Sequence, residues 1–200
     1  MAAGSARGDA GTAARILDIA GELVQARGFN GFSYADVAAQ VGISKAALHY
    51  HFPGKADLGL ALITGYASRF TESLASIDRA GAAPKDRLAE YARLYDGVLR
   101  QGKMCLCGML AAEYQTLSAP MRAAVAGFFE ANESWLEKVL EEGRQDASLR
   151  FTGTTRDAAR MILACLEGAM LVARSSGDPD RLRSITASLL ADLTQPVGEP

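Results

Sequence analysis

The sequence of 200 residues contains few histidines, cysteines and aromatic residues. It has two histidines, His49 and His51, and three cysteines, and only 7% of its residues are aromatic. Positions two apart on a helix point to different faces, and no cysteine lies close to the histidine pair in the sequence. A Ser-His-Asp site would need one of the same two histidines, on an exposed helix. The sequence therefore predicts no metal, no cofactor and no enzymatic activity.

Long apolar segments are also absent. The sequence has no run of about 18 apolar residues, the length that a membrane-spanning helix requires. The N-terminal segment MAAGSARGDAG has no apolar core of the kind found in signal peptides. We therefore expect a cytoplasmic protein without a membrane partner, in which residues 1–11 form a disordered tail. In that compartment the three cysteines are expected to be reduced thiols.

Alanine, leucine and helical periodicity are abundant instead. Hydrophobic residues make up 49% of the chain, and alanine and leucine favour helices. Apolar residues recur at helical spacing along most of the sequence, whereas no stretch alternates as a β-strand does. The pattern predicts an all-α fold of about nine helices. The expected helices span residues 12–27, two short segments within 32–54, 55–77, a segment from Pro84, 105–117, 121–143, 155–176 and 179–194.

The stretch Phe32–Leu58 predicts two short, well-capped helices followed by the start of a long one. Ser33 can cap the first helix, and Asp36 can complete a capping box. Gly42 can end this helix in the left-handed conformation, and Ser44 repeats the cap before the second helix. Two capped helices joined by a short turn that contains glycine are typical of a helix-turn-helix.

The same stretch resembles the DNA-binding domain of the TetR family of bacterial repressors. The resemblance rests on Gly28-Phe29, Ser33, Asp36-Val37-Ala38, Val41-Gly42-Ile43-Ser44-Lys45, Leu48, His51-Phe52 and Lys55-Ala56-Asp57-Leu58. One position departs from the family, which usually has a tyrosine directly after the position of Leu48, where this chain has His49. The resemblance implies a three-helix, helix-turn-helix DNA-binding domain at residues 1–54 and a helical ligand-binding and dimerisation domain at residues 55–200.

In a helix-turn-helix, the second helix enters the major groove and its first residues meet base edges. Lys45 is the only long polar side chain among those first residues, and it can donate to guanine or to phosphate. Helix N-termini and, by resemblance, the rest of this helix add contacts to the DNA backbone. The predicted DNA contacts are Ser33, Tyr34, Ser44, Lys45, Ala46, Ala47, His49, Tyr50, His51 and Lys55. Residues 1–58 contain five basic and five acidic side chains, so binding must depend on the placement of a few groups.

By the same resemblance, the helical body should hold a pocket for a small-molecule effector. The candidate contacts are Tyr66, Phe70, Tyr91, Tyr95, Cys105, Cys107, Met109, Glu113, Tyr114, Phe128, Asn132, Trp135 and Cys165. For each of them the competing interpretation is plain core or surface. Glu113 and Asn132 are the most informative pair, because a polar residue on an apolar stripe needs a partner when it is buried.

Cys105 and Cys107 support an alternative interpretation. They open a predicted helix, where the helix dipole lowers the pKa of a thiol, and Lys103 lies close by in the sequence. The segment CLCGMLAAE also resembles the same region of family repressors that respond to electrophiles or unsaturated small acids. The competing interpretation is that both cysteines are small buried hydrophobes. The alternative function is a repressor that senses electrophiles or redox state through these thiols.

The sequence thus predicts a ligand-responsive transcriptional repressor that binds a near-palindromic operator as a homodimer. The segment 155–176 is apolar nearly all round and needs partners on several sides. The resemblance implies that this segment pairs with 179–194 and with a second copy of the chain. A rival class is a small helical enzyme or ligand carrier that keeps the head as a relic, which only the neutral charge of the head supports. The effector, the operator and the choice between repression and activation stay open.

Overall fold

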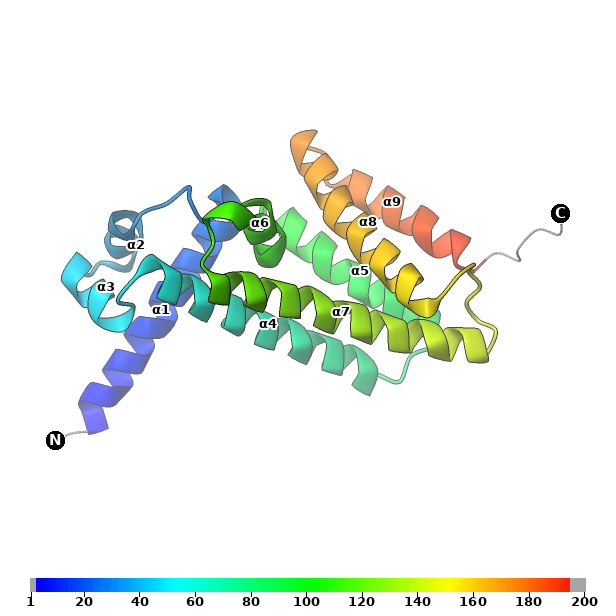
Figure 1. Cartoon of the computed structure of the whole chain (residues 1–200), viewed down its shortest axis with the longest axis horizontal. Coiled ribbons are helices and arrows are strands. Elements are labelled where there is room, and N and C mark those ends of the chain that lie inside the picture. Colours follow the sequence, from blue (N-terminus) through cyan, green and yellow to red (C-terminus); the bar gives the residue numbers. More distant parts are fainter. Residues whose placement is uncertain (1–2, 195–200) are drawn as a thin grey trace. The chain divides into compact units, whose positions relative to one another are not determined.

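Helices make up nearly all of the chain. The computed structural model describes the backbone of residues 3–194 and the side chains of residue 9 and residues 11–194. Within that range the chain forms nine α-helices and one short 3-10 helix and no strand, which confirms the predicted all-α fold (Figure 1). No helix in that range is both long and apolar enough to cross a membrane. The elements are α1 (Ala3–Arg27), α2 (Tyr34–Val41), α3 (Lys45–His51), α4 (Lys55–Arg79), α5 (Pro84–Arg100), α6 (Leu106–Ala112), the 3-10 helix η1 (Tyr114–Thr116), α7 (Ala119–Gln145), α8 (Thr155–Ser175) and α9 (Asp180–Asp192).

Helix α1 begins earlier than the sequence analysis predicted. It starts at Ala3 rather than Thr12, so residues 3–11 are helical and the prediction of a disordered tail is wrong for them. The segment contains three alanines and no proline, and it continues the helical backbone of residues 12–27 although each of its three glycines weakens a helix by about 1 kcal/mol. Residues 1 and 2 of the predicted tail lie outside the described residues.

The predicted helix at residues 105–117 is shorter than expected and is divided. Helix α6 covers only Leu106–Ala112, and η1 follows it. The Thr116 hydroxyl donates to the Glu113 carbonyl at 2.9 Å, and a local side-chain bond of this kind competes with the helical hydrogen bonds of the backbone. Cys105 therefore precedes the helix instead of lying in its first turn.

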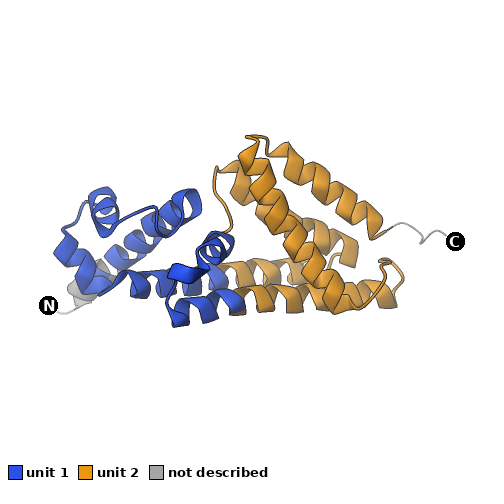
Figure 2. Cartoon of the chain, turned by 45° about the horizontal axis from the view of Figure 1, so that its top comes forward, with its two compact units in different colours: residues 1–68, 106–126 blue, residues 69–105, 127–200 orange. Residues whose placement is uncertain are grey.

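The described chain separates into two compact units, which Figure 2 distinguishes by colour. Unit 1 comprises residues 1–68 and 106–126, and unit 2 comprises residues 69–105 and 127–200. This division differs from the predicted domains 1–54 and 55–200, because α6 packs on α1 and because α4 and α7 each contribute residues to both units. The functional boundary at residue 54 stays a prediction.

In unit 1 the predicted caps of the helix-turn-helix are present. Ser33 caps α2 in a capping box with Asp36, and Gly42 ends that helix with a φ of 77°. The Ser44 hydroxyl accepts a hydrogen bond from the Ala47 N–H at 3.1 Å at the start of α3. These caps fix where α2 and α3 begin and end. The core that they cover includes Ile16, Ala20, Val24, Val37, Leu48 and Leu58.

Unit 2 is built around α5, α8 and α9, which contact one another. Pro84 stands in the first turn of α5, as predicted. One side of α8 is buried through Ala159, Ile162, Leu166 and Met170. The other side exposes 53% of Met161, 57% of Leu171 and 49% of Val172. The described residues of the chain therefore leave an apolar face of α8 uncovered.

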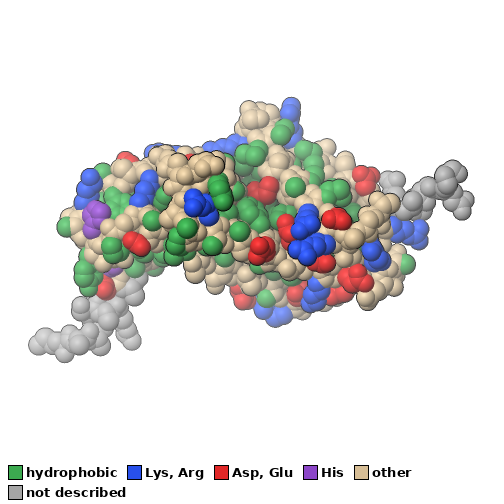
Figure 3. All heavy atoms as spheres, in the orientation of Figure 1, with side chains coloured by type: hydrophobic (Ala, Val, Ile, Leu, Met, Phe, Trp, Pro, Cys, Tyr) green, Lys and Arg blue, Asp and Glu red, His purple; other side chains and the backbone are tan. Residues whose placement is uncertain are grey.

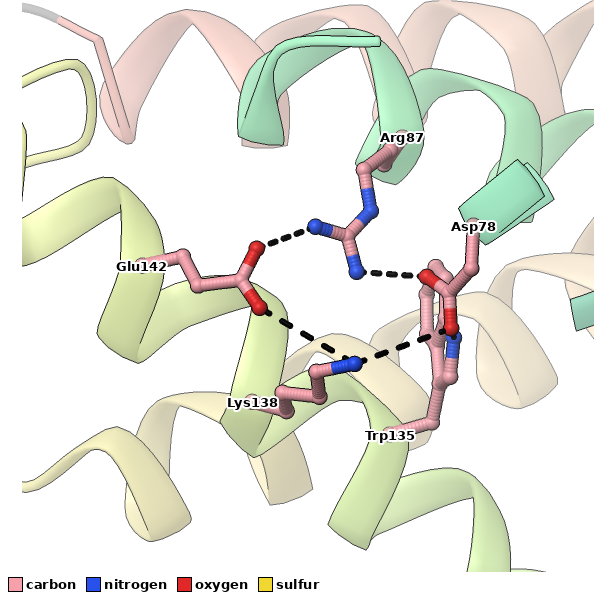
Figure 4. Close-up of polar contacts among 5 residues, drawn as sticks. All are labelled: Asp78, Arg87, Trp135, Lys138 and Glu142. Carbon is pink, nitrogen blue, oxygen red and sulfur yellow. Dashed lines mark hydrogen bonds and ion pairs between the residues drawn. The ribbon is translucent and has the colours of Figure 1, made fainter. Parts of the chain in front are cut away.

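A buried arginine joins three helices of unit 2 (Figure 4). The Arg87 side chain is only 8% exposed, and it donates to Asp78 at 2.5 Å and to Glu142. The Trp135 indole donates to the second oxygen of Asp78 at 3.1 Å. The Lys138 ammonium lies 3.9 Å from Asp78 and 4.0 Å from Glu142. The charge of the buried guanidinium is thus compensated by two carboxylates, which a buried ion requires.

Candidate nucleic-acid interface and effector site

Half of the predicted DNA contacts line one hollow in unit 1. Its lining consists of Ser33, Tyr34, Lys45, His49 and Lys55 together with Phe32, around a volume of about 320 Å³. These residues come from the cap and start of α2, from α3 and from the start of α4. Lysine, hydroxyl and imidazole groups are the kinds of donor that bind phosphate oxygens of DNA. The hollow therefore has the chemistry of a contact to the DNA backbone.

Two side chains of the hollow also make contacts within unit 1. The Tyr34 hydroxyl donates to the Phe52 carbonyl at 2.9 Å, and burial, with a smaller effect of Asp57, raises the pKa of Tyr34 to about 12. The His49 ring packs on the Tyr34 ring with 4.7 Å between centres, and its Nδ1 lies 3.0 Å from the Pro53 carbonyl. With Nδ1 engaged at that carbonyl, a DNA contact of His49 would use Nε2.

Lys55 has a structural role in unit 1. Its Nζ donates to the Phe32 carbonyl at 2.5 Å and lies 4.8 Å from the centre of the Phe29 ring and 4.4 Å from that of Phe32. Burial lowers the pKa of Lys55, and the charges of Glu113 and Asp36 act in the opposite direction. Lys55 thus links the start of α4 to the segment before α2. Its predicted contact with phosphate stays a prediction.

The outer side of α3 carries further predicted DNA contacts. Lys45, Ala46 and His49 are exposed, and Tyr50 is 75% exposed. On the face drawn in Figure 3, histidine and a few separate basic side chains reach the surface around α2 and α3, and acidic side chains lie among them. The basic groups near α3 are therefore single side chains, in a head that has no net positive charge.

The other predicted DNA contacts on α3 face partners inside the chain. The Ser44 hydroxyl and the Ala47 N–H bond to each other in the cap. The His51 side chain is only 10% exposed, and its Nε2 lies 3.4 Å from Asp9 of α1. Their contacts with DNA stay predictions, and the exposed residues Lys45 and Tyr50 are the better placed ones.

Five of the predicted effector contacts pack on one another in unit 2 and form what we call the aromatic cluster: Phe70, Tyr91, Tyr95, Phe128 and Trp135. The Tyr91 and Trp135 rings stack with 5.4 Å between centres, and Phe70 meets Tyr91, Tyr95 and Phe128 edge-on at 6.1, 6.0 and 5.3 Å. Tyr91 is fully buried, and 2% of Tyr95 is exposed. The cluster joins α4, α5 and α7 through contacts that favour such ring geometries.

Polar atoms inside the aromatic cluster satisfy one another. The Tyr91 hydroxyl donates to Asn132 Oδ1 at 3.0 Å and lies 3.1 Å from the Tyr95 hydroxyl. Asn132, which is 2% exposed, donates through Nδ2 to the Phe128 carbonyl at 2.8 Å. Burial raises the pKa of both tyrosines, so both are neutral hydrogen-bonding groups. The buried side chain of Asn132 is therefore hydrogen-bonded, as a polar residue on an apolar helix face requires.

Glu167 of α8 is a candidate functional residue that the sequence analysis missed. Burial raises its pKa to about 7, and a hydrogen bond with Cys105 acts in the opposite direction. Its Oε1 atom is buried and has no hydrogen-bond partner among the described residues. Its charge also raises the pKa of Tyr91 and Tyr95. One acid within the apolar segment MILACLEGAM was the signal that could have identified it.

The remaining predicted effector contacts lie outside this group. Tyr66, Cys107, Met109, Glu113 and Tyr114 belong to unit 1. Glu113 accepts a hydrogen bond from the Asn30 N–H at 2.9 Å, and Tyr114 lies under the Arg122 guanidinium at 5.3 Å. Cys165 is half-buried in α8, and burial raises the pKa of its thiol. Within the described range, no group of three or more histidine, cysteine and acidic side chains could hold a metal ion.

Two family profiles match the chain. Residues 16–62 match "Bacterial regulatory proteins, tetR family", and residues 84–189, more than half of the chain, match "Tetracyclin repressor-like, C-terminal domain". The chain belongs to the TetR family. The first match covers the helix-turn-helix and confirms the resemblance of that stretch to the TetR family.

Individual TetR-family relatives cover most of the chain. The transcriptional regulator AcuR of Cereibacter sphaeroides is 30% identical over 183 residues, which are 89% of this chain and 84% of AcuR. The repressor NemR of Escherichia coli K12 is 26% identical over 88% of this chain and 90% of NemR. A TetR-family regulator from Agrobacterium tumefaciens superposes with a TM-score of 0.90 at 33% identity and covers 94% of this chain and 100% of its own. This chain is therefore a transcriptional regulator with a DNA-binding helix-turn-helix.

Proposed function

We propose that this TetR-family regulator is a repressor that binds a near-palindromic operator as a homodimer and is released by a small molecule in its helical body. The observation that carries the proposal is the outer side of α3, where exposed Lys45 stands directly after the Ser44 cap and beside the hollow of phosphate-binding groups. Two recognition helices would then meet successive turns of the major groove, roughly 34–36 Å apart.

The uncovered apolar face of α8 supports the homodimer. Met161, Leu171 and Val172 are each about half exposed, and contiguous exposed apolar surface marks an interaction site in a soluble protein. We propose that residues 155–176 and 179–194 of two copies pair there. Leu171→Glu should convert the dimer to a monomer in sedimentation velocity, whereas Glu130→Gln, an exposed change in α7, should leave the dimer intact.

The aromatic cluster with Asn132 and Glu167 supports an effector site in unit 2. It combines ring faces with a few buried polar atoms, as small-molecule sites usually do. A ligand that satisfies the buried Glu167 oxygen while it separates the rings would bind one conformation of the body better than another. Such a difference in affinity is what an effector needs to change the DNA-binding state.

A gel-shift series with the DNA upstream of the protein's own gene tests the proposal. We expect retention at low salt and, for Lys45→Ala, a loss of affinity of about tenfold, the size of one good base contact. Lys85→Ala, which removes an exposed lysine of α5, is the matched control and should bind as the wild type does. No retention of the wild type would refute DNA binding at this site, and an unaffected Lys45→Ala would show that α3 is not the reading helix.

A thiol-sensing repressor is the second candidate, and the hydrogen bond between Cys105 and Glu167 favours it. A carboxylate whose pKa lies near neutrality is well matched to accept a thiol proton. The sulfur would add to the β-carbon of an unsaturated electrophile, and Glu167 would pass the thiol proton to the α-carbon. One solved relative, NemR, is described in its reduced form, with a TM-score of 0.81 at 26% identity over 94% of this chain and 99% of its own. Cys105 and Cys107 are 2% and 0% exposed, which favours the competing role as core residues.

Mass spectrometry after mild treatment with N-ethylmaleimide separates the two candidates. A thiol sensor should gain one adduct at Cys105 and lose operator binding, and Cys105→Ser should resist both changes. Cys107→Ser is the matched control and should behave as the wild type does. An unmodified Cys105 under conditions that label Cys165 would eliminate the thiol sensor and leave a non-covalent effector.

A further inference from the structure

The turn between α1 and α2 is held by residues that follow it in the chain by more than eighty positions. The Asn30 N–H donates to Glu113 Oε2 at 2.9 Å, and Asn30 Nδ2 donates to the Thr116 hydroxyl at 2.8 Å. The Thr116 hydroxyl in turn donates to the Glu113 carbonyl. We call Asn30, Glu113 and Thr116 the α6 latch. All three belong to unit 1, and they connect α6 and η1 to the corner that precedes the helix-turn-helix.

The turn between α1 and α2 has a glycine where the Glu113 carboxylate approaches the backbone. Gly28 has a φ of 84°, and a β-carbon at this position would lie 2.2 Å from Glu113 Oε1. The same β-carbon would lie 3.7 Å from the Met109 methyl group of α6. The glycine therefore serves both a left-handed conformation and the close approach of the carboxylate.

A second close approach joins the start of α7 to the same unit. A β-carbon on Gly59 of α4 would lie 2.5 Å from the Met121 methyl group and 3.0 Å from the Phe29 ring. Phe29 directly precedes Asn30, so the segments on both sides of η1 pack against the α1–α2 turn or its neighbours. Unit 1 is therefore more than the helix-turn-helix, because residues 106–126 complete it.

Charge links the latch to the start of α2. The carboxylate of Glu113 acts on the half-buried Lys55 ammonium and, with Asp36, opposes the effect of burial on its pKa. Lys55 holds the Phe32 carbonyl, one residue before the Ser33 cap. Loss of the Glu113 carboxylate would therefore weaken both the turn after α1 and the lysine that holds the beginning of α2.

We infer that Glu113 and Asn30 are positioning residues that couple the conformation of residues 106–117 to the DNA-reading helix-turn-helix. Cys105, the residue directly before α6, shares a hydrogen bond with Glu167 of the proposed effector site, so a ligand that engages Glu167 would act on the residue that leads into α6. Coupling between two sites is reciprocal, so operator binding must also act on residues 106–117. The inference rests on the proposed function for its DNA-dependent half, whereas the latch itself can be tested in the free protein.

Hydrogen exchange read by mass spectrometry tests the inference, with and without the DNA upstream of the protein's own gene. In the wild type we expect operator DNA to slow exchange in residues 106–117 about fivefold. Glu113→Ala should abolish that effect, speed exchange at residues 28–32 of the free protein about tenfold and weaken operator binding about tenfold. Glu113→Gln keeps an acceptor for Asn30 and should retain most of the DNA effect. Gln115→Ala, in the same exposed turn, is the matched control and should match the wild type.

The possible results distinguish failure of the coupling from failure of the proposed function. If the wild type is retained by DNA while residues 106–117 do not respond, or if Glu113→Ala responds as the wild type does, the coupling is refuted and the proposed repressor stands. If the wild type is not retained in the gel shift, the proposed function fails, and unchanged exchange at residues 28–32 in Glu113→Ala would refute the latch as well. If circular dichroism shows that Glu113→Ala is unfolded, Thr116→Val decides, because it removes the hydroxyl that bonds to the Asn30 side chain and to the Glu113 carbonyl but keeps the Glu113 carboxylate. That variant should lose about half of the DNA effect, and no loss would refute the inference.

Discussion

The two compact units use polar groups in opposite ways. In unit 1, polar side chains join helix ends and turns: Tyr34 holds the end of α3, Lys55 holds the segment before α2, and Glu113 holds the turn after α1. In unit 2, two networks of polar groups reach the interior, where Arg87 joins two carboxylates and Tyr91 bonds within the aromatic cluster. Bonds at helix ends fix the geometry of a surface, whereas interior polar atoms can exchange their partners for those of a ligand. Under the proposed function, DNA reading and effector recognition therefore depend on separate sets of contacts.

Arg87→Ala should have the largest effect, on the stability of unit 2. We expect the free energy of unfolding to fall by about 3–4 kcal/mol, because a buried ion pair that loses one partner leaves uncompensated charge. Partial exposure of Asp78 and Glu142 and the presence of Lys138 keep the loss near the lower end. Arg93→Ala, which breaks an exposed pair on the same helix, should change stability by less than about 1 kcal/mol. Equal effects in urea unfolding would show that the interior network does not hold unit 2 together.

The pH dependence of stability should report on Glu167. Its pKa is raised from 4.5 to about 7 in the folded protein, so between these values the folded state binds a proton that the unfolded chain has lost. Its contribution to stability is complete below a pH of about 4.5 and is lost as the pH rises through about 7, with a total of about 3 kcal/mol. The measurement is the difference in unfolding free energy between wild type and Glu167→Gln across that range.

The other acids titrate in both of these proteins and cancel in the difference. Glu130→Gln, which changes an exposed carboxyl of unit 2, is the matched control and should follow the wild type. A difference that stayed constant with pH would mean that folding does not raise the pKa of Glu167, and the match between its pKa and the thiol proton would be lost.

Local features were predictable from the sequence, and contacts between distant segments were not. The capping box joins Ser33 and Asp36, which are three residues apart, and the end of α2 depends on Gly42 alone, so propensity and spacing were sufficient. The bond of Glu113 to Asn30 spans 83 residues. Sequence spacing carries no information on such a pair, and Glu113 was therefore assigned to the effector pocket on its polarity alone.

Lys55 and Glu167 illustrate the same limit at the candidate sites. Lys55 stands at a helix start, which favours an anion, but the rings of Phe29 and Phe32 and the Phe32 carbonyl surround its ammonium. Glu167 was overlooked because helical periodicity places one acid in an apolar helix equally well on a solvent face or inside. Only the packing of α5 against α8 decides between these positions.

A double-mutant cycle at the α6 latch should measure the interaction between Gly28 and Glu113 in unit 1. Gly28→Ala should lower stability by about 2 kcal/mol, because a β-carbon is strained at a φ of 84° and displaces the Glu113 carboxylate from Asn30. In a Glu113→Ala background only the backbone strain remains, so the same substitution should lower stability by about 1 kcal/mol. Gly42→Ala, with a φ of 77° and no atom within 4 Å of its β-carbon, is the control for strain alone. Additive effects in urea unfolding would show that Gly28 and Glu113 do not share an interaction.

The smallest effects on stability are expected from two variants, each of which removes one hydroxyl group from one of the units. Tyr34→Phe and Tyr91→Phe should each lower stability by about 1 kcal/mol, the usual contribution of a hydrogen bond whose partner stays behind. Their effects on operator binding should differ. Tyr34→Phe releases the Phe52 carbonyl at the end of α3 and should weaken binding about threefold, whereas Tyr91→Phe changes a bond inside unit 2 and should leave binding unchanged. Gel shifts of the two variants at matched folded concentration make the measurement. Equal losses of operator affinity would mean that the interior bonds of unit 2 also set the geometry of the reading helix, and the separation between the two sets of contacts would be wrong.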